Sequence, residues 1–211
     1  MDWNAYSQWY QQHFEREIND FVSFIIHELD VDYQARILDV GCGPGWVSLK
    51  LAQRLPDAEI IGLDSNAELL NHSNQNKQQE NIANVNFINS KPENLSIFSS
   101  HSFDAVISFK TFHQWHDPYQ AMNEFNRILK KNGKYAISDY RRDLKLLAKV
   151  SIWFSSKTIP PDFRSHWKMM FLKCYSLEEI LKILLKTELK DWKIRTTLFD
   201  YMIYKLSADA F

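Results

Sequence analysis

The chain has 211 residues and a formal net charge of −1, with 45% hydrophobic and 24% charged residues. This length and balance predict one globular domain over residues 1–211 and exclude a mainly disordered chain. No apolar run approaches the roughly 18 residues of a membrane span, and the N-terminus lacks the basic and apolar regions of a signal peptide, so we expect a cytoplasmic protein. The two cysteines, Cys42 and Cys174, have no metal-ligand spacing around them and argue against a disulfide or a metal site.

Charge is unevenly distributed along the chain. Residues 1–70 hold 4 basic and 12 acidic side chains, whereas residues 140–173 hold 8 basic and 2 acidic ones. Such asymmetry is typical either of a surface that binds an anion or of a solvated helix face. Because the overall balance is near zero, we do not expect a nucleic-acid partner.

The first thirty residues predict an amphipathic helix, because their apolar residues recur at steps of three and four. These residues are Trp3, Tyr6, Trp9, Tyr10, Phe14, Ile18, Phe21, Phe24 and Ile25. A stripe at this spacing usually packs in the core. The alternative is a helical lid over a ligand site, with Tyr6, Trp9 or Tyr10 lining the pocket.

Strands and helices then alternate, with near-continuous apolar strands of the kind that helices cover on both faces. The expected strands are 36–41, 58–63, 85–89, 103–108 and 133–139, and the expected helices are 45–55, 66–80 and 117–130. This alternation predicts an α/β fold with a doubly wound, Rossmann-like, mostly parallel sheet. Cations and Gly133 after Arg127 predict that the last of these helices ends within Lys130 to Gly133.

The pattern changes after Asp139. Residues 140–174 predict an insertion on the substrate side of the sheet, with a turn at Pro160-Pro161. Ser176 and Glu179 form the signature of a capping box at the start of a helix that we expect to run to about Leu189. Two closing strands follow at 192–197 and 198–206, the last of them antiparallel.

A glycine-rich turn follows the first strand and holds three of the five glycines of the chain, at Gly41, Gly43 and Gly45. Glycine lets a ligand approach the backbone closely, so this position predicts a ligand loop. Asp64 ends the second strand, roughly 20 residues further on, where nucleotide-binding folds place the acid that binds ribose. The carboxylate of Asp39, just before the glycines, favours a ligand that carries an ammonium and a sulfonium group over a pyrophosphate.

In order and spacing, these motifs resemble those of class I S-adenosylmethionine-dependent methyltransferases over nearly the full chain. The matching segments are 37–45, 62–64, 102–108, 112–118, 127–133 and 138–143. The resemblance implies a seven-stranded sheet of order 3-2-1-4-5-7-6 with strand 7 antiparallel, and S-adenosylmethionine as the cofactor. It extends to the quinone-type group, which implies a small-molecule acceptor.

The resemblance also implies which residues bind the cofactor. Asp39 would face the amino group, Gly41 and Gly43 the methionine and ribose portion, and Asp64 the ribose hydroxyls. The other expected cofactor-binding residues are Cys42, Ser65, Ser90, Lys91 and Ser108.

One segment departs from the family pattern. The family commonly has Gly-Asp-Ala-Glu after its third strand, whereas this chain has Ser90-Lys91-Pro92-Glu93. A protonated Lys91 cannot accept a hydrogen bond and Pro92 has no N–H to donate, so adenine must be held differently. Side-chain groups of Asn89 or Ser90 are the candidate substitutes.

Candidate catalytic residues lie after the fourth and fifth strands. His113 and Tyr140 are the main candidates for a general base, with His116 and Asp139 beside them, while packing is the alternative role for the histidines. Candidate substrate-binding residues are Tyr6, Tyr10, Arg141, Arg142 and Trp167. The arginines would suit an acidic or phosphorylated acceptor, because guanidinium groups pair well with carboxylates and phosphates.

Two alternatives to a small-molecule methyltransferase stay open. The basic insertion favours an RNA or protein acceptor, although the segment Ser108 to Thr111 lacks the Asn/Asp-Pro-Pro-Tyr motif of base- and glutamine-methylating enzymes. The unusual Lys91-Pro92 pair favours a methyltransferase-like protein that binds partners or ligand without catalysis.

Overall fold

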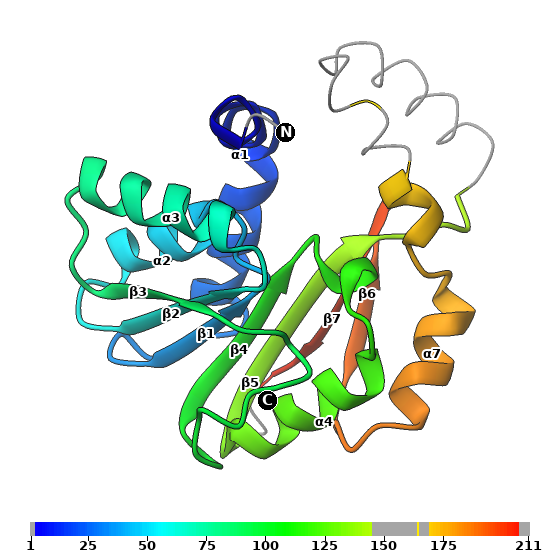
Figure 1. Cartoon of the computed structure of the whole chain (residues 1–211). Helices are drawn as coiled ribbons and strands as arrows, with labels where there is room; N and C mark the ends of the chain where they lie inside the picture. The colour runs from blue at the N-terminus through cyan, green and yellow to red at the C-terminus, as the bar shows by residue number, and fades with distance from the viewer. Residues whose placement is uncertain (1–2, 145–163, 165–168, 207–211) are drawn as a thin grey trace.

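The computed structural model describes residues 3–144, 164 and 169–206 (Figure 1). A single seven-stranded sheet has the order β3-β2-β1-β4-β5-β7-β6. Strand β7 runs antiparallel to both of its neighbours, and the pairs from β3 to β5 are parallel. The predicted fold class, strand order and antiparallel strand 7 are therefore confirmed.

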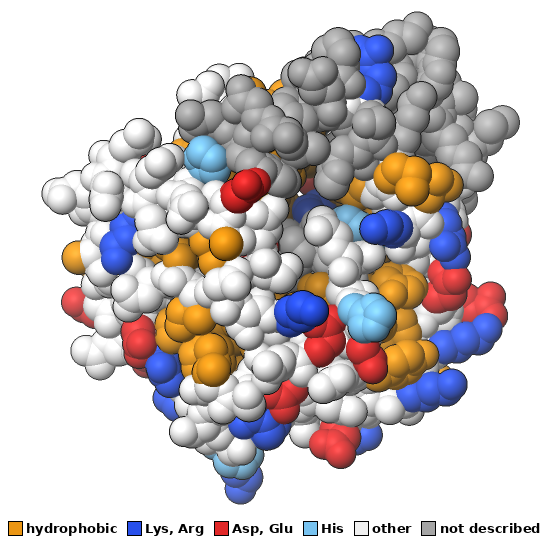
Figure 2. Space-filling model, viewed as in Figure 1, with side chains coloured by type: hydrophobic (Ala, Val, Ile, Leu, Met, Phe, Trp, Pro, Cys, Tyr) orange, Lys and Arg blue, Asp and Glu red, His pale blue; other side chains and the backbone are white. Residues whose placement is uncertain are grey.

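The strands are β1 (Arg36–Val40), β2 (Glu59–Asp64), β3 (Val85–Asn89), β4 (Phe103–Phe109), β5 (Leu129–Tyr140), β6 (Lys193–Thr196) and β7 (Asp200–Lys205). The helices are α1 (Trp3–His27), α2 (Trp46–Arg54), α3 (Ala67–Gln79), the short 3-10 helix η1 (Phe112–Gln114), α4 (Pro118–Ile128) and α7 (Leu177–Leu185). No helix in this described set is long and apolar enough to cross a membrane. The face of the molecule drawn in Figure 2 carries both basic and acidic side chains.

The helices form a layer on each face of the sheet. Helices α1, α2 and α3 lie on one side and α4 and α7 on the other, as Figure 1 shows. Each face of the sheet has its own hydrophobic cluster. Consecutive residues of a strand, such as Ile37 and Leu38 of β1, belong to opposite clusters. Neighbouring strand residues point to opposite faces, so a sheet covered on both sides needs continuous apolar strands.

The aromatic stripe of helix α1 divides into a part that packs in the core and a part that lines a cavity. Its later turns pack in the core, where Ile18 and Ile25 are fully buried. Its first turns lie beside the glycine loop, where Tyr6 and Tyr10 line a cavity. Core packing is therefore confirmed for the later part of the stripe, while a lid role for the earlier part stays a prediction.

The predicted end of helix α4 was wrong. The helix ends at Ile128, and Lys130 to Gly133 belong to β5, where the pairing with β4 shifts between Phe103 and Ala105. Lys130 pairs with the carboxylate of Asp104 across this irregularity, at 2.8 Å. The cations that resembled a helix end therefore contact the neighbouring strand.

The capping box at the start of α7 is confirmed, because Ser176 and Glu179 exchange both hydrogen bonds. The helix ends at Leu185, a turn earlier than Leu189. Most of the insertion, including the turn at Pro160-Pro161 and Trp167, lies outside the described residues.

Candidate active site

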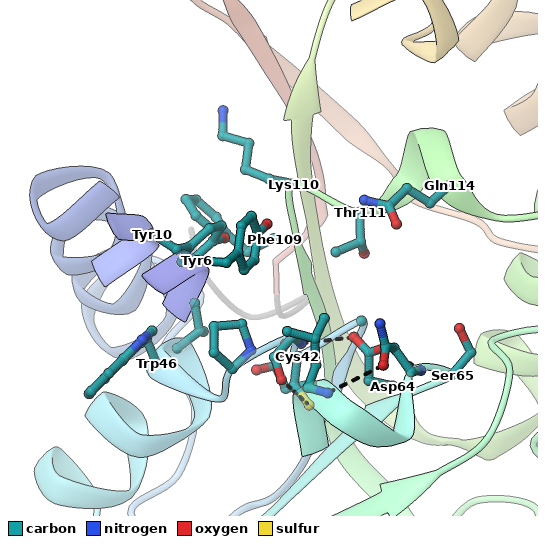
Figure 3. Close-up of a pocket in the computed structure, with 17 residues that line it drawn as sticks. Tyr6, Tyr10, Cys42, Trp46, Asp64, Ser65, Phe109, Lys110, Thr111 and Gln114 are labelled. Carbon is teal, nitrogen blue, oxygen red and sulfur yellow. Dashed lines mark hydrogen bonds between the residues drawn. The ribbon is translucent and has the colours of Figure 1, made fainter. Parts of the chain in front are cut away.

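The glycine loop, the ends of β1, β2 and β4, and helix α1 enclose a cavity of about 270 Å³, which we call the loop cavity (Figure 3). Its walls bring together many predicted site residues that are distant in sequence. They are Tyr6, Tyr10, Asp39, Gly41, Cys42, Gly43, Asp64 and Ser65. The cavity lies at the carboxyl ends of the parallel strands, where open α/β sheets bind their ligands.

The loop is held by backbone bonds to the end of β2. The amides of Gly41 and Cys42 both donate to the carbonyl oxygen of Leu63, at 2.7 and 3.0 Å. Gly41 has a φ of 75°, and a Cβ there would lie only 2.3 Å from Oγ1 of Thr111. Glycine is therefore required at position 41 by conformation and by space.

Asp64 joins the loop to the start of α3. Its Oδ2 accepts a hydrogen bond from the amide of Gly43 and its Oδ1 one from the amide of Asn66, each at 2.8 Å. Burial raises the pKa of Asp64, and these backbone hydrogen bonds oppose the shift. The carboxylate also faces the cavity, so it can accept hydrogen bonds from a ligand's hydroxyl groups.

Asp39 is a buried carboxyl group in the wall of the loop cavity. The hydroxyl of Ser48 donates to its Oδ2 at 2.6 Å. Burial raises the pKa of Asp39 to about 7, and the charge of Asp64 adds to this shift. A cationic ligand group in the cavity would favour the charged form of this acid.

A second cavity, of about 170 Å³, adjoins the first and is called the outer cavity. Its own walls are Leu63, Lys91, Pro92, Glu93, Trp115 and His116. It shares Gly41, Asp64, Ser65, Thr111 and Gln114 with the loop cavity. Asp64 thus stands where the two compartments meet, and an extended ligand could occupy both.

The first turns of α1 cover the loop cavity. The indole N–H of Trp46 donates to the backbone oxygen of Ser7 at 3.3 Å, which ties α1 to α2. Burial raises the pKa of Tyr6 to about 12 and raises that of Tyr10 well above its ordinary value. Both tyrosines are therefore neutral covers of the cavity at physiological pH.

Lys110 follows β4 and was not predicted as a site residue. Its backbone has a φ of 58°, in the left-handed region. Its buried ammonium group lies 3.0 Å from Asp200 and 3.5 Å from Glu17 of α1, above the ring of Tyr140. Lys110 lines the loop cavity and a further cavity of about 510 Å³ between α1 and β7, and its ion pairs connect α1 to the sheet.

His113 lines neither the loop cavity nor the outer cavity. Its side chain is 1% exposed, and Asp139 accepts hydrogen bonds from its backbone amide at 2.8 Å and pairs with its Nδ1 at 2.9 Å. Asp139 also accepts from the amide of Tyr140. This geometry anchors η1 to the end of β5, while a catalytic role for His113 stays a prediction.

Cys174 lies close to this pair, and the three side chains offer atoms within 4.8 Å of one another. The thiol donates to the carbonyl oxygen of Met170 at 3.3 Å. Burial, followed by the charge of Asp139, raises the pKa of Cys174. Metals bind the thiolate form of cysteine, so this environment disfavours a metal here. Among the described residues, this is the one group of histidine, cysteine and acidic side chains close enough together to hold a metal ion.

Several other predicted residues line neither the loop cavity nor the outer cavity. Tyr140 is buried beneath Lys110, and Ser108 is buried with its hydroxyl 2.9 Å from Thr111. Arg141 pairs with Asp143, and Arg142 pairs with Glu179. Neither arginine lines the loop cavity or the outer cavity, nor does Ser90.

The residues that sequence reasoning missed lie mainly after β4 and at the start of α2. They are Trp46, Val47, Asn66, Leu69, Phe109, Lys110, Thr111, Gln114, Pro92, Glu93 and Trp115. The sequence could have indicated that these residues lie at the carboxyl edge of the sheet. It could not indicate which residues of the loop after β4 line the cavities.

The two loop glycines should respond differently to alanine. Gly41→Ala forces a left-handed residue and a contact with Thr111, so we expect it to lower the free energy of unfolding by more than about 2 kcal/mol. Gly43 has a φ of 54°, but a Cβ at this position would have no atom within 4 Å. In Gly43→Ala, backbone strain alone should therefore lower the free energy of unfolding by about 1 kcal/mol. Urea unfolding of both variants measures the difference, and equal losses would contradict the assigned close approach.

Comparison with known proteins identifies the family. The model of the methyltransferase-domain family matches residues 32–201, so the chain belongs to this family, as its motifs predict. A malonyl-[acyl-carrier protein] O-methyltransferase from Acetivibrio thermocellus is 29% identical over 142 residues, which cover 62% of this chain and 48% of that protein. A ubiquinone/menaquinone biosynthesis C-methyltransferase from Rickettsia prowazekii is 30% identical over 157 residues, covering 68% and 63%.

A third relative is named as a methyltransferase of ribosomal RNA. A ribosomal RNA small subunit methyltransferase G from Legionella pneumophila is 40% identical over 72 residues, which cover 34% of each chain. The alignments thus span less than two thirds of the length of all three relatives.

Solved structures support the fold. An S-adenosyl-L-methionine-dependent methyltransferase structure from Methanococcus maripaludis has a TM-score of 0.79 with 22% identity, covering 99% of this chain and 93% of that one. A similar match to a methyltransferase from Aquifex aeolicus has a TM-score of 0.67 with 18% identity, covering 89% and 95%.

Proposed function

We propose that this chain transfers a methyl group from S-adenosylmethionine to a small-molecule acceptor. The observation that carries the proposal is the meeting of Asp39, Asp64 and the glycine loop around two adjoining compartments. This arrangement offers a carboxylate for an ammonium group at one end and a carboxylate for ribose in the middle. Family membership supports the same cofactor.

The described residues fit this cofactor. Ribose is the central part of the ligand, so Asp64 at the junction of the compartments would bind its hydroxyl groups. The amino group would lie in the loop cavity beside Asp39, whose buried carboxyl group has a hydrogen bond from Ser48 but no cationic partner among the described residues. The base would then occupy the outer cavity.

When bound, S-adenosylmethionine supplies a methyl group that its sulfonium already activates, so the protein's main task is alignment. Tyr6 and Tyr10 would exclude water from the loop cavity. Their raised pKa values, and that of Cys42, keep all three protonated. None of these three side chains is therefore a free general base, which favours an acceptor that reacts without a base or that uses other residues.

Relatives favour a small molecule over RNA. The names of two relatives describe acyl-carrier-protein-linked and quinone chemistry, and these alignments cover more of the chain than the ribosomal RNA match does. An acidic or phosphorylated acceptor has weaker support, because Arg141 and Arg142 are each paired with a carboxylate.

The proposal is tested by following formation of S-adenosylhomocysteine from S-adenosylmethionine with panels of acids, phenols, amines and thiols. We expect turnover with at least one class, and its loss in Asp64→Ala. Cofactor binding without turnover on any panel or on cell extract would favour the non-catalytic alternative. An RNA acceptor would instead show affinity for bulk RNA that falls steeply with salt.

Cofactor binding should depend on pH through Asp39. Its pKa is near 7 in the free protein because it is buried, and an ammonium group favours the ionised form. Affinity for S-adenosylhomocysteine should thus be highest above pH 8 and fall toward about tenfold per unit below pH 7, with proton release on binding near neutrality. Calorimetry in two buffers of different ionisation enthalpy measures this, and an Asp39→Asn variant that kept the same proton release would refute the assignment.

A further inference from the structure

The segment after β3 presents no matched donor and acceptor to a ligand base. Residues 91–94 form a turn closed by a 3.0 Å hydrogen bond from the amide of Asn94 to the carbonyl oxygen of Lys91. Pro92 takes the second position of this turn, where its fixed φ is favoured. The ammonium group of Lys91 only donates, and Pro92 has no N–H to offer.

The substitutes expected from the sequence are already engaged. The side-chain amide of Asn89 donates to the backbone oxygen of Asp64 at 3.0 Å. The hydroxyl of Ser90 donates to the backbone oxygen of Asn94 at 2.9 Å. Both groups stabilise the local chain, and Ser90 is absent from the walls of the outer cavity.

Glu93 does line the outer cavity, but it has a structural task. Its Oε1 accepts hydrogen bonds from the backbone amides of His116 and Asp117, at 2.7 and 3.1 Å. This acid therefore joins the loop after β3 to the loop after β4.

On the opposite wall, two of the polar side chains are also unavailable. The hydroxyl of Thr111 donates to the backbone oxygen of Val40 at 3.2 Å and contacts Ser108. The ring of Trp115 packs against Phe112, and its indole nitrogen is buried without a hydrogen-bond partner in the described structure.

Gln114 differs from these neighbours. It is exposed, ends η1, and lines both cavities. Figure 3 shows its side chain beside Thr111, on the side of the loop cavity where Asp64 and Ser65 lie. Its side-chain amide makes no hydrogen bond with any residue that the structure describes, although its backbone is fixed by the bond from its amide to Thr111. The group is therefore held near the site and remains available.

We propose that the side-chain amide of Gln114 recognises the adenine base of the cofactor. A primary amide offers one acceptor and one donor side by side, the pattern that pairs with the exocyclic amino group and N7 of adenine. Ser65, Lys91 and His116 are the other polar side chains of the outer cavity without a hydrogen bond to any described residue, and none of them offers this side-by-side pair. The inference rests on the proposed function, since it assumes that the cofactor's base occupies the outer cavity.

The test compares S-adenosylhomocysteine with S-inosylhomocysteine, in which an oxygen acceptor replaces the amino group. Calorimetry of the unaltered chain should give at least tenfold tighter binding of the adenine ligand. Gln114→Leu should weaken that ligand about tenfold and bring the ratio of the two affinities close to one. The matched controls, Lys91→Ala and His116→Ala, should keep the ratio of the unaltered chain.

A second variant separates the two hydrogen bonds. Gln114→Glu keeps the acceptor for the amino group and loses the donor to N7, so the preference for adenine should persist with lower affinity. Unaltered thermal unfolding shows that each variant is folded.

The outcomes distinguish this inference from the proposed function. Absence of any S-adenosylhomocysteine binding by the unaltered chain would remove the proposed cofactor site itself. Binding with a ratio below about threefold, or with a ratio that Gln114→Leu leaves unchanged, would overturn the role of Gln114 alone. The role of Gln114 would also be overturned if His116→Ala or Lys91→Ala lost the preference for the adenine ligand while Gln114→Leu kept it.

Discussion

Asp64→Ala is expected to weaken S-adenosylhomocysteine binding by about 10- to 100-fold. Two losses add here: the charge-assisted hydrogen bonds to ribose, and the support that the carboxylate gives to the glycine loop through the amide of Gly43. Calorimetry at pH 8 measures the affinity, because Asp39 is then mostly ionised in the free protein as well.

The control for this prediction separates ligand contact from loop support. Asp64→Asn keeps the size of the side chain and one acceptor oxygen, so it should bind the ligand with intermediate affinity. The backbone amides of Gly43 and Asn66 report loop structure by NMR in the free variants. Unchanged affinity in Asp64→Ala would show that ribose does not lie at the junction of the two cavities.

Asp139→Ala is expected to lower the free energy of unfolding by about 3 to 5 kcal/mol. The carboxylate is fully buried and accepts hydrogen bonds from the amides of His113 and Tyr140 as well as facing the imidazole of His113. Removing it leaves these donors buried without partners, and their desolvation is then uncompensated. Urea unfolding measures the loss.

A matched control is the partly exposed carboxylate of Asp143, which pairs with Arg141. Asp143→Ala should cost no more than about 1 kcal/mol, because exposed ion pairs contribute little. If the two variants lost the same stability, Asp139 would not be the buried anchor of η1. Retained methyl transfer in a folded His113→Gln variant would assign His113 a structural role rather than a catalytic one.

The sequence was sufficient to predict the doubly wound α/β fold, because strand apolarity and helix periodicity are local signals, whereas the strand order came from the resemblance to the methyltransferase family. The end of α4 was not predictable in this way. Lys130 and Gly133 resemble a helix end locally, but pairing of Lys130 with Asp104 on the neighbouring strand places them in β5. A contact between strands determined that boundary, and single-segment patterns do not contain it.

The candidate site shows the same division. Gly41 and Asp64 were predictable because the glycine loop and the acid after β2 stand at fixed spacing. Lys110 and Gln114 were not, since their importance depends on where the chain turns after β4 and on which groups meet there. Ser90 was expected at the ligand, but its hydroxyl closes the local turn.

The most direct measurement is a crystal structure of the chain with S-adenosylhomocysteine bound. We expect the amino group beside Asp39, the ribose hydroxyls within hydrogen-bond distance of Asp64, and the base in the outer cavity near Gln114. A ligand in the reversed orientation, or one bound away from Asp64 and the glycine loop, would contradict the proposed site.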